Sequence, residues 1–249
     1  MDPNLTKQLE NDFDSKIENL LDGKNHFVLN NHNYDFLSYN QHPLAINCVG
    51  KSLLVRSSDK KLLEELEIEY SDYPAEWFME TQSLMKLQNI LKNYDMTIIN
   101  MVPIMVPSRN FKKIESPYKF TRIKEEDFLK FKGIAKFAFS FDTGIWKDRL
   151  ALAYYDDDKL IAIAGSNQNS KYLWEIGVEK FDNNPKYKNL TSDLVNNLVS
   201  IARDENPEVT VIYSTQFSHV KSMNVAVRAS YDFAFTVVDA DKLKGAVAK

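Results

Sequence analysis

The chain has 249 residues, of which 44% are hydrophobic and 12% aromatic, enough for one large or two small domains with buried cores. Its formal net charge of −4 at pH 7 gives no basis for predicting nucleic-acid binding. The single cysteine, Cys48, excludes an internal disulfide, and no apolar run is long enough to span a bilayer. We therefore expect a cytoplasmic protein with neither a nucleic-acid nor a membrane partner.

The N-terminal half alternates between helical and extended patterns, which predicts an α+β domain. Apolar residues recur at helical spacing over 5–21, and Gly23 is suited to end that helix. The apolar run 95–106 predicts a pair of strands interrupted by Pro103. Further strands are expected over 43–49 and 53–56, and further helices over 60–69 and 74–93.

The basic and polar segment 107–117 has a proline at each end and is the predicted domain boundary. We therefore expect an N-terminal domain over 1–116 and a C-terminal domain over 117–249. Strands in the second domain are predicted over 118–123, 150–155, 159–164, 172–181, 209–213 and 233–238. Helices are predicted over 124–132, from about 192 to 202, and over 218–229.

A strand, a polar loop and a helix follow one another between 172 and 202. Gly177 lies inside the predicted strand, where glycine often marks a bulge or the close approach of a ligand or another backbone. Thr191 or Ser192 is the expected N-cap of the helix, and Asp193 adds negative charge at its positive end. The free amides of such a helix start can hold a pyrophosphate.

A specific set of residues lies between 174 and 234. It consists of Trp174, Ile176, Gly177, Val178, Pro185, Tyr187, Thr215, Ser218, His219, Ser222, Asn224, Ala226, Ala229 and Ala234. These residues match a pattern that reads W-x-I-G-[IV]-x-V-x-P-x-[YF]-R-G-x-G and, after a helix, T-S-x-S-H-x-x-S-x-N-x-A. The region thereby resembles the cofactor half of one branch of the GNAT superfamily of acyl-CoA-dependent N-acyltransferases. The resemblance covers about 118–241 and implies a mixed α/β domain whose sheet is splayed at its centre.

The phosphate loop departs from this family because it contains no glycine between Gly177 and Gly245. Glycine lets backbone amides approach a pyrophosphate closely, so we expect weakened, salt-dependent binding of acetyl-CoA. The side chains of Tyr187 and Leu190 are expected to oppose binding by filling the space that glycine leaves. Replacement contacts are predicted from the charges of Lys186 and Lys188 and from the side-chain donors of Asn189, Thr191 and Ser192.

The resemblance also implies that pantetheine runs beside Ile176, Gly177 and Val178 and bonds to their backbone. Asn224 is expected to bond either to pantetheine or to a neighbouring backbone carbonyl. Glu175 is the candidate base for the amine proton, with a solvent-facing or lysine-paired carboxylate as the alternative. His219 is a candidate base or substrate-orienting group, with a backbone-bonding histidine as the alternative.

No metal site is predicted. Asp156, Asp157 and Asp158 lie in a predicted hairpin turn, where aspartate is favoured for backbone reasons. His26, His32 and His42 share no metal-ligand spacing.

The sequence thus predicts an N-acetyltransferase that moves an acetyl group from acetyl-CoA to a small-molecule or peptide amine. The alternative is a GNAT-fold protein that has lost efficient cofactor binding and serves as a binding or regulatory module. The missing glycines favour this alternative. The sequence predicts neither the oligomeric state nor the role of the N-terminal half.

Overall fold

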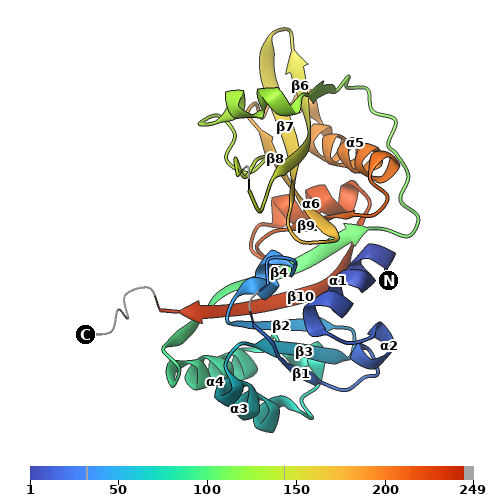
Figure 1. Ribbon diagram of the computed structural model, residues 1–249. Coiled ribbons are helices and arrows are strands. Elements are labelled where there is room, and N and C mark those ends of the chain that lie inside the picture. Colours follow the sequence, from blue (N-terminus) through green and yellow to red (C-terminus); the bar gives the residue numbers. More distant parts are fainter. Residues whose placement is uncertain (32, 143, 244–249) are drawn as a thin grey trace. The chain divides into compact units, whose positions relative to one another are not determined.

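The computed structural model describes residues 1–31, 33–142 and 144–243, which form two compact units (Figure 1). Among the described residues, the C-terminal unit comprises Met1–Leu5 and Ile104–Phe233, and the N-terminal unit comprises Thr6–Pro103 and the residues from Ala234 to Leu243. The units therefore do not follow the predicted division at 116/117. Strand β4 (Met96–Pro107) leads out of the N-terminal unit, and strand β10 (Tyr231–Lys242) leads back into it.

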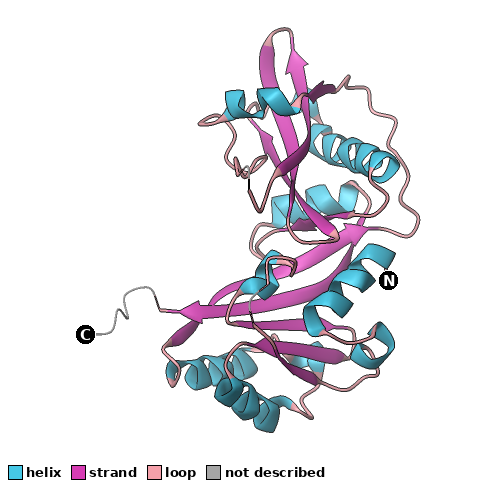
Figure 2. Cartoon of the chain, viewed as in Figure 1, coloured by secondary structure: helices cyan, strands magenta, loops and turns pink. Residues whose placement is uncertain are grey.

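The N-terminal unit contains a sheet with strand order β1-β3-β2-β10 (Figure 2). β1 is parallel to β3, whereas β2 is antiparallel to both β3 and β10. One face carries Ile46, Val55 and Val238 and packs against buried leucines of helices α3 and α4. The elements of this unit are α1 (Pro3–Phe13) from Thr6 onward, α2 (Ile17–Leu20), β1 (His26–Leu29), β2 (Leu44–Val49), β3 (Ser52–Ser57), α3 (Lys60–Tyr70) and α4 (Thr81–Lys92).

The opposite face of this sheet carries a row of buried polar side chains, because residues along a strand alternate between faces. Asn47 of β2, Arg56 of β3 and Asp239 of β10 are at most 1% exposed. Arg56 donates to the carbonyl of His42. Neither side-chain oxygen of Asp239 has a hydrogen-bond partner among the described residues. Within this row, burial raises the pKa of Asp239 to about 7.

The C-terminal unit contains the mixed sheet that the sequence predicts, with strand order β4-β9-β8-β7-β6-β5. β8 and β9 are parallel, and the other neighbouring pairs are antiparallel. The strands are β5 (Thr121–Ile123), β6 (Asp148–Asp156), β7 (Lys159–Gln168), β8 (Leu173–Lys180) and β9 (Thr210–Ser214), and the helices are α5 (Leu190–Glu205) and α6 (Val220–Arg228).

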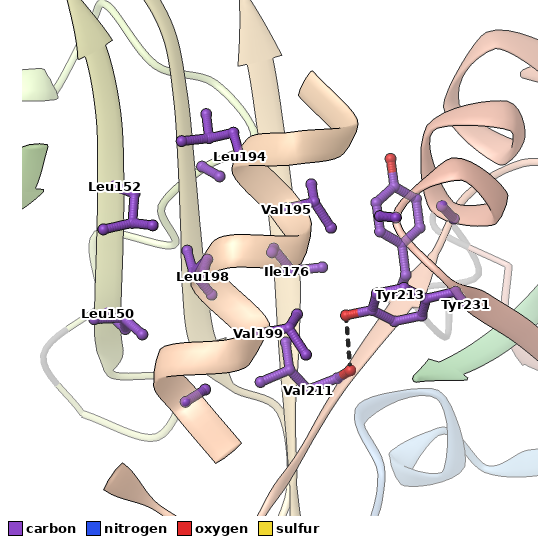
Figure 3. Close-up of a cluster of buried hydrophobic side chains, with 14 of the residues drawn as sticks. Leu150, Leu152, Ile176, Leu194, Val195, Leu198, Val199, Val211, Tyr213 and Tyr231 are labelled. Carbon is purple, nitrogen blue, oxygen red and sulfur yellow. Dashed lines mark hydrogen bonds between the residues drawn. The ribbon is translucent and has the colours of Figure 1, made fainter. Parts of the chain in front are cut away.

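The two faces of this sheet are covered by different segments. Helix α5 presents Leu194 and Leu198 to Leu152 of β6 and Ile176 of β8 in the largest apolar cluster of the unit (Figure 3). The other face is covered by the 3-10 segment Glu125–Phe131 and by the chain that follows it, through Phe139. Burial of these side chains at roughly 25 cal/mol per Å² fixes the sheet between its two covers.

Several predicted element boundaries are corrected by the structure. The predicted helix over 5–21 is two helices, because the chain turns at Asp14 with φ +45°. The run 95–106 is one continuous strand, β4, with Pro103 inside it. Helix α5 begins at Leu190 with Asn189 at its N-cap, so neither Thr191 nor Ser192 is the cap.

Candidate functional site

The parallel pairing of β8 and β9 ends in the middle of the sheet. The ladder contains Leu173–Thr210, Trp174–Val211 and Glu175–Ile212 and goes no further, although β8 continues to Lys180. β7 accompanies β8 over this whole length, up to the pair Ala162–Lys180. The sheet is therefore splayed at its centre, as predicted.

Alternation along β8 determines which backbone groups face the gap. The carbonyl of Tyr172, just before β8, accepts from Thr210 N at 3.0 Å. The backbone N–H and C=O groups of the even-numbered residues of β8 therefore point toward β9. In a parallel ladder that ends at Glu175–Ile212, the last donor is the N–H of Ile176. The carbonyl of Ile176 and both backbone groups of Val178 then face the gap, and the described hydrogen bonds give them no partner.

Gly177 is approached closely by another backbone. A Cβ atom at this position would lie 1.8 Å from the carbonyl oxygen of Phe137, and one at Gly165 on β7 would lie 2.0 Å from that of Ala138. The approaching segment is anchored to β8, because Glu179 Oε1 accepts the N–H groups of Lys136, Phe137 and Ala138 at 2.6, 2.7 and 3.1 Å. The segment 136–138 thus covers one face of β8 at Gly177, so a ligand can reach the backbone of β8 only at the strand edge that faces β9.

Glu175 lies in the last residue pair before the gap and is half-buried. Its carboxylate accepts from Asn169 Nδ2 at 2.5 Å and from Ser214 Oγ at the end of β9. The sequence reasoning missed both partners. Ser214 could have been found from its position, because the residue that ends a strand parallel to β8 lies beside the split. The proton-accepting role of Glu175 stays a prediction.

His219 and Asn224 lie on the segment that follows β9. His219 is exposed at the N-cap of α6, and its Nδ1 lies 3.4 Å from Thr215 Oγ1. Ser218 directly precedes this N-cap position. Asn224 is exposed on α6. Among the described residues, no hydrogen bond or ion pair joins His219 or Asn224 to Glu175, so their roles stay predictions.

The glycine-free loop presents a row of backbone N–H groups. Asn189 adopts the left-handed conformation, with φ +61°, which a glycine commonly supplies and which asparagine tolerates. Helix α5 starts directly after it, and Ser192 Oγ donates to the carbonyl of Asn189 at 2.8 Å. The backbone N–H groups of 188–192 have no acceptor among the described hydrogen bonds. They stand at the positive end of the α5 dipole.

The side chains of this loop differ from their predicted arrangement. Tyr187 and Leu190 are 4% and 0% exposed and belong to the apolar core under α5, so they do not fill the space outside the helix start. Lys186 Nζ lies 2.6 Å from Asp156 Oδ2, a contact that raises the pKa of Lys186. Lys188 is exposed and has no ion pair among the residues that the structure describes. Thr191 is half-buried in the first turn of α5.

The described part of the chain contains no group of three or more His, Cys, Asp or Glu side chains that could hold a metal ion, and His32 lies outside it. None of the described helices is both long and apolar enough to cross a membrane.

The split, the open edge of β8 and the α5 start together define a GNAT-like fold in the C-terminal unit. No family model matches the chain, and no curated protein matches it either. Solved structures with similar folds include a GCN5-related N-acetyltransferase from Kribbella flavida, with 17% identity, a TM-score of 0.45 and 65% coverage of both chains. A GCN5-related N-acetyltransferase-like protein from Streptococcus suis 89/1591 has 12% identity and a TM-score of 0.43, covering 81% of this chain and 85% of that one.

An aminoglycoside acetyltransferase, solved in complex with coenzyme A and kanamycin, has 13% identity and a TM-score of 0.34 and covers 48% of this chain and 94% of that one. This chain spans less than two thirds of the Kribbella protein. Similarity at this level assigns neither an activity nor a substrate to the chain.

Proposed function

We propose that the protein transfers an acetyl group from acetyl-CoA to an amine. The observation that carries this proposal is the gap after Glu175, where β8 leaves the carbonyl of Ile176 and both backbone groups of Val178 facing away from β7. The pantetheine arm contains two amide groups. It can therefore pair with this edge in the way that an added strand pairs with a sheet.

The start of α5 supplies the second part of a cofactor site. The N–H groups of 188–192 and the positive end of the helix dipole favour a pyrophosphate, with the dipole contributing about 0.3–1 kcal/mol in exposed geometry. Lys188 adds a point charge without an ion-pair partner among the described residues, whereas the charge of Lys186 is paired with Asp156. Thr191 and Ser192 contribute to this site through their backbone N–H groups. The predicted weakening of binding by the missing glycines is thus smaller than the loop composition suggests.

Glu175 is the group proposed to accept the proton of the attacking amine. Bound acetyl-CoA supplies an activated thioester, and the products are an amide and the free thiol of coenzyme A. Asn169 and Ser214 fix the Glu175 carboxylate beside the gap, so that one proton acceptor stands at a defined place. His219 is retained as a candidate for orienting the acceptor, a small-molecule or peptide amine.

Calorimetric titration with acetyl-CoA, followed by a thiol-release assay over a panel of amines, tests this function. We expect a Kd below about 1 mM, which corresponds to roughly −4 kcal/mol, and amine-dependent release of thiol. Weaker binding together with no thiol release from any amine would contradict the proposal. That result would favour a GNAT-fold binding or regulatory module instead.

A further inference from the structure

We propose that Tyr118 is a positioning residue that holds the glycine-free loop in its pyrophosphate-binding conformation. This inference rests on the proposed function, because it concerns the same cofactor site. The Tyr118 hydroxyl lies 2.8 Å from the carbonyl oxygen of Lys188 and 3.2 Å from that of Lys186. Tyr118 precedes β5 and is about seventy residues from the loop in sequence.

The carbonyl groups of two successive loop residues are held from outside the loop. The Tyr118 hydroxyl donates to that of Lys188 at 2.8 Å, with the Lys186 carbonyl oxygen next to it at 3.2 Å, and Lys180 Nζ donates to that of Tyr187 at 3.0 Å. A trans peptide points its N–H opposite to its C=O. Fixing the carbonyls of Tyr187 and Lys188 therefore aims the N–H groups of residues 188 and 189 away from Lys180 and Tyr118, on the side that leads into the α5 start.

The Tyr118 ring is itself fixed by its neighbours. It packs edge-on against Tyr154 of β6 at a centroid distance of 5.0 Å, and Tyr154 packs against Tyr187 at 6.1 Å. Ser116 Oγ accepts from Tyr118 N at 3.2 Å and donates to Asp193 in the first turn of α5 at 2.9 Å. Because ring and backbone are both anchored, the hydroxyl stands at a defined place relative to α5.

The rest of the segment before Tyr118 is bound along the same helix. Asn196 of α5 accepts from Ile114 N at 2.7 Å and donates to the carbonyl of Lys112 at 3.1 Å. Asn197 donates to the carbonyl of Ile114 at 3.2 Å. These bonds hold the loop in one conformation, whereas a glycine-rich loop can adopt several. A ligand that binds this loop therefore does not pay the entropic cost of ordering it.

The test uses the full-length chain and the variant Tyr118→Phe, which keeps the ring and removes the hydroxyl. We expect its affinity for acetyl-CoA to fall roughly 3- to 10-fold, as for the loss of one hydrogen bond. Its affinity for pantetheine, which lacks the pyrophosphate, should change less than about twofold. In the thiol-release assay the KM for acetyl-CoA should rise while kcat is unchanged.

Tyr70→Phe is the matched control. The Tyr70 hydroxyl also donates to a backbone carbonyl, that of Ser83 at 3.0 Å, but in the N-terminal unit. This variant should lose stability in urea without losing affinity for acetyl-CoA. The control therefore shows whether a loss of stability alone lowers the affinity for acetyl-CoA, or whether the loop before α5 must lose its conformation.

The outcomes distinguish the inference from the proposed function. If the wild-type chain binds acetyl-CoA and Tyr118→Phe binds it equally well, the positioning role is wrong and the proposed function stands. An equal loss of affinity for acetyl-CoA and for pantetheine also overturns the positioning role, because the effect would not be specific to the pyrophosphate. If the wild-type chain binds no acetyl-CoA, both the proposed function and this inference fail.

Discussion

Replacing Gly177 by alanine tests the close contact that confines a ligand to the edge of β8. The added methyl would lie 1.8 Å from the Phe137 carbonyl oxygen and 2.5 Å from its carbonyl carbon. Both neighbours are backbone atoms, so no side chain can rotate out of the way. The segment must move outward by about 1 Å or more, which stretches its bonds to Glu179.

Two costs add up in the Gly177→Ala variant. Overpacking of this kind costs roughly 1–3 kcal/mol. Loss of the acceptor for the N–H of Ala138, a buried residue, costs roughly another 1–3 kcal/mol, whereas the N–H groups of the exposed Lys136 and Phe137 can turn to water. We expect a total of about 2–6 kcal/mol. Combined with Glu179→Ala, the cost should be less than the sum of the two single changes, because both loosen the same segment.

Urea unfolding followed by tryptophan fluorescence measures this loss, since Trp174 is 8% exposed in the core of the C-terminal unit. Gly133→Ala is the control. Gly133 has φ +84° and open space around its Cα, so alanine there adds backbone strain of about 1 kcal/mol without a clash. If Gly177→Ala unfolds within about 0.5 kcal/mol of wild type, or costs less than Gly133→Ala, the reasoning about the contact is refuted.

Four further predictions follow from the site and the core. Glu175→Gln should lower kcat by about 10²- to 10⁴-fold while acetyl-CoA affinity, measured by calorimetry, stays unchanged. Lys188→Ala should weaken acetyl-CoA binding about 2- to 5-fold and flatten its salt dependence, whereas Lys186→Ala, which loses a paired charge, should change it less. Leu190→Ala should cost roughly 2–5 kcal/mol in urea unfolding, because its side chain is fully buried. Asp239→Asn should stabilise the chain more at pH 8 than at pH 5.

The sign of the Asp239 effect follows from its raised pKa. Burial, with a smaller contribution from Asp241, raises the pKa of Asp239 to about 7. The unfolded carboxyl has a pKa of about 3.9, so between about pH 4 and pH 7 the folded chain keeps a proton that the unfolded chain releases. Stability is therefore highest below this window, falls as pH rises through it and levels off above it. Equal shifts of the urea midpoint at the two pH values would contradict this account.

Local periodicity predicts much of the C-terminal sheet. The strand that becomes β8 and the hairpin of β6 and β7 are predicted, because each depends on residues close together in the chain. The central splay between β8 and β9 is expected from the GNAT resemblance instead. The turn of this hairpin is also predictable from local sequence. Asp157 adopts the left-handed conformation there, with φ +51°, which aspartate tolerates in turns. A glycine inside the strand predicts either a bulge or a close approach, and the structure shows the close approach of the Phe137 backbone to Gly177.

Contacts between distant residues are not predictable from such patterns. Nothing around Phe137 or Tyr118 indicates that one packs on Gly177 and the other on the loop before α5. The domain boundary shows the same limit. The polar segment 107–117 has the composition of a linker, yet Ile114 is bonded along α5, and β10 returns to pair Asp239 with Ala45 in the N-terminal sheet.

The missing glycines illustrate why composition alone does not decide whether a loop can offer its N–H groups to an anion. A backbone can offer its N–H groups to an anion if no side chain stands in the way and if the peptide planes are turned outward. Glycine meets the first condition by having no side chain. This loop meets it by burying Tyr187 and Leu190 under α5. The second condition is met by the donors of Tyr118 and Lys180, which hold the carbonyls on the other side. A loop built in this way depends on a hydroxyl group far away in the sequence, so Tyr118, rather than any loop residue, should be the most sensitive position for pyrophosphate binding.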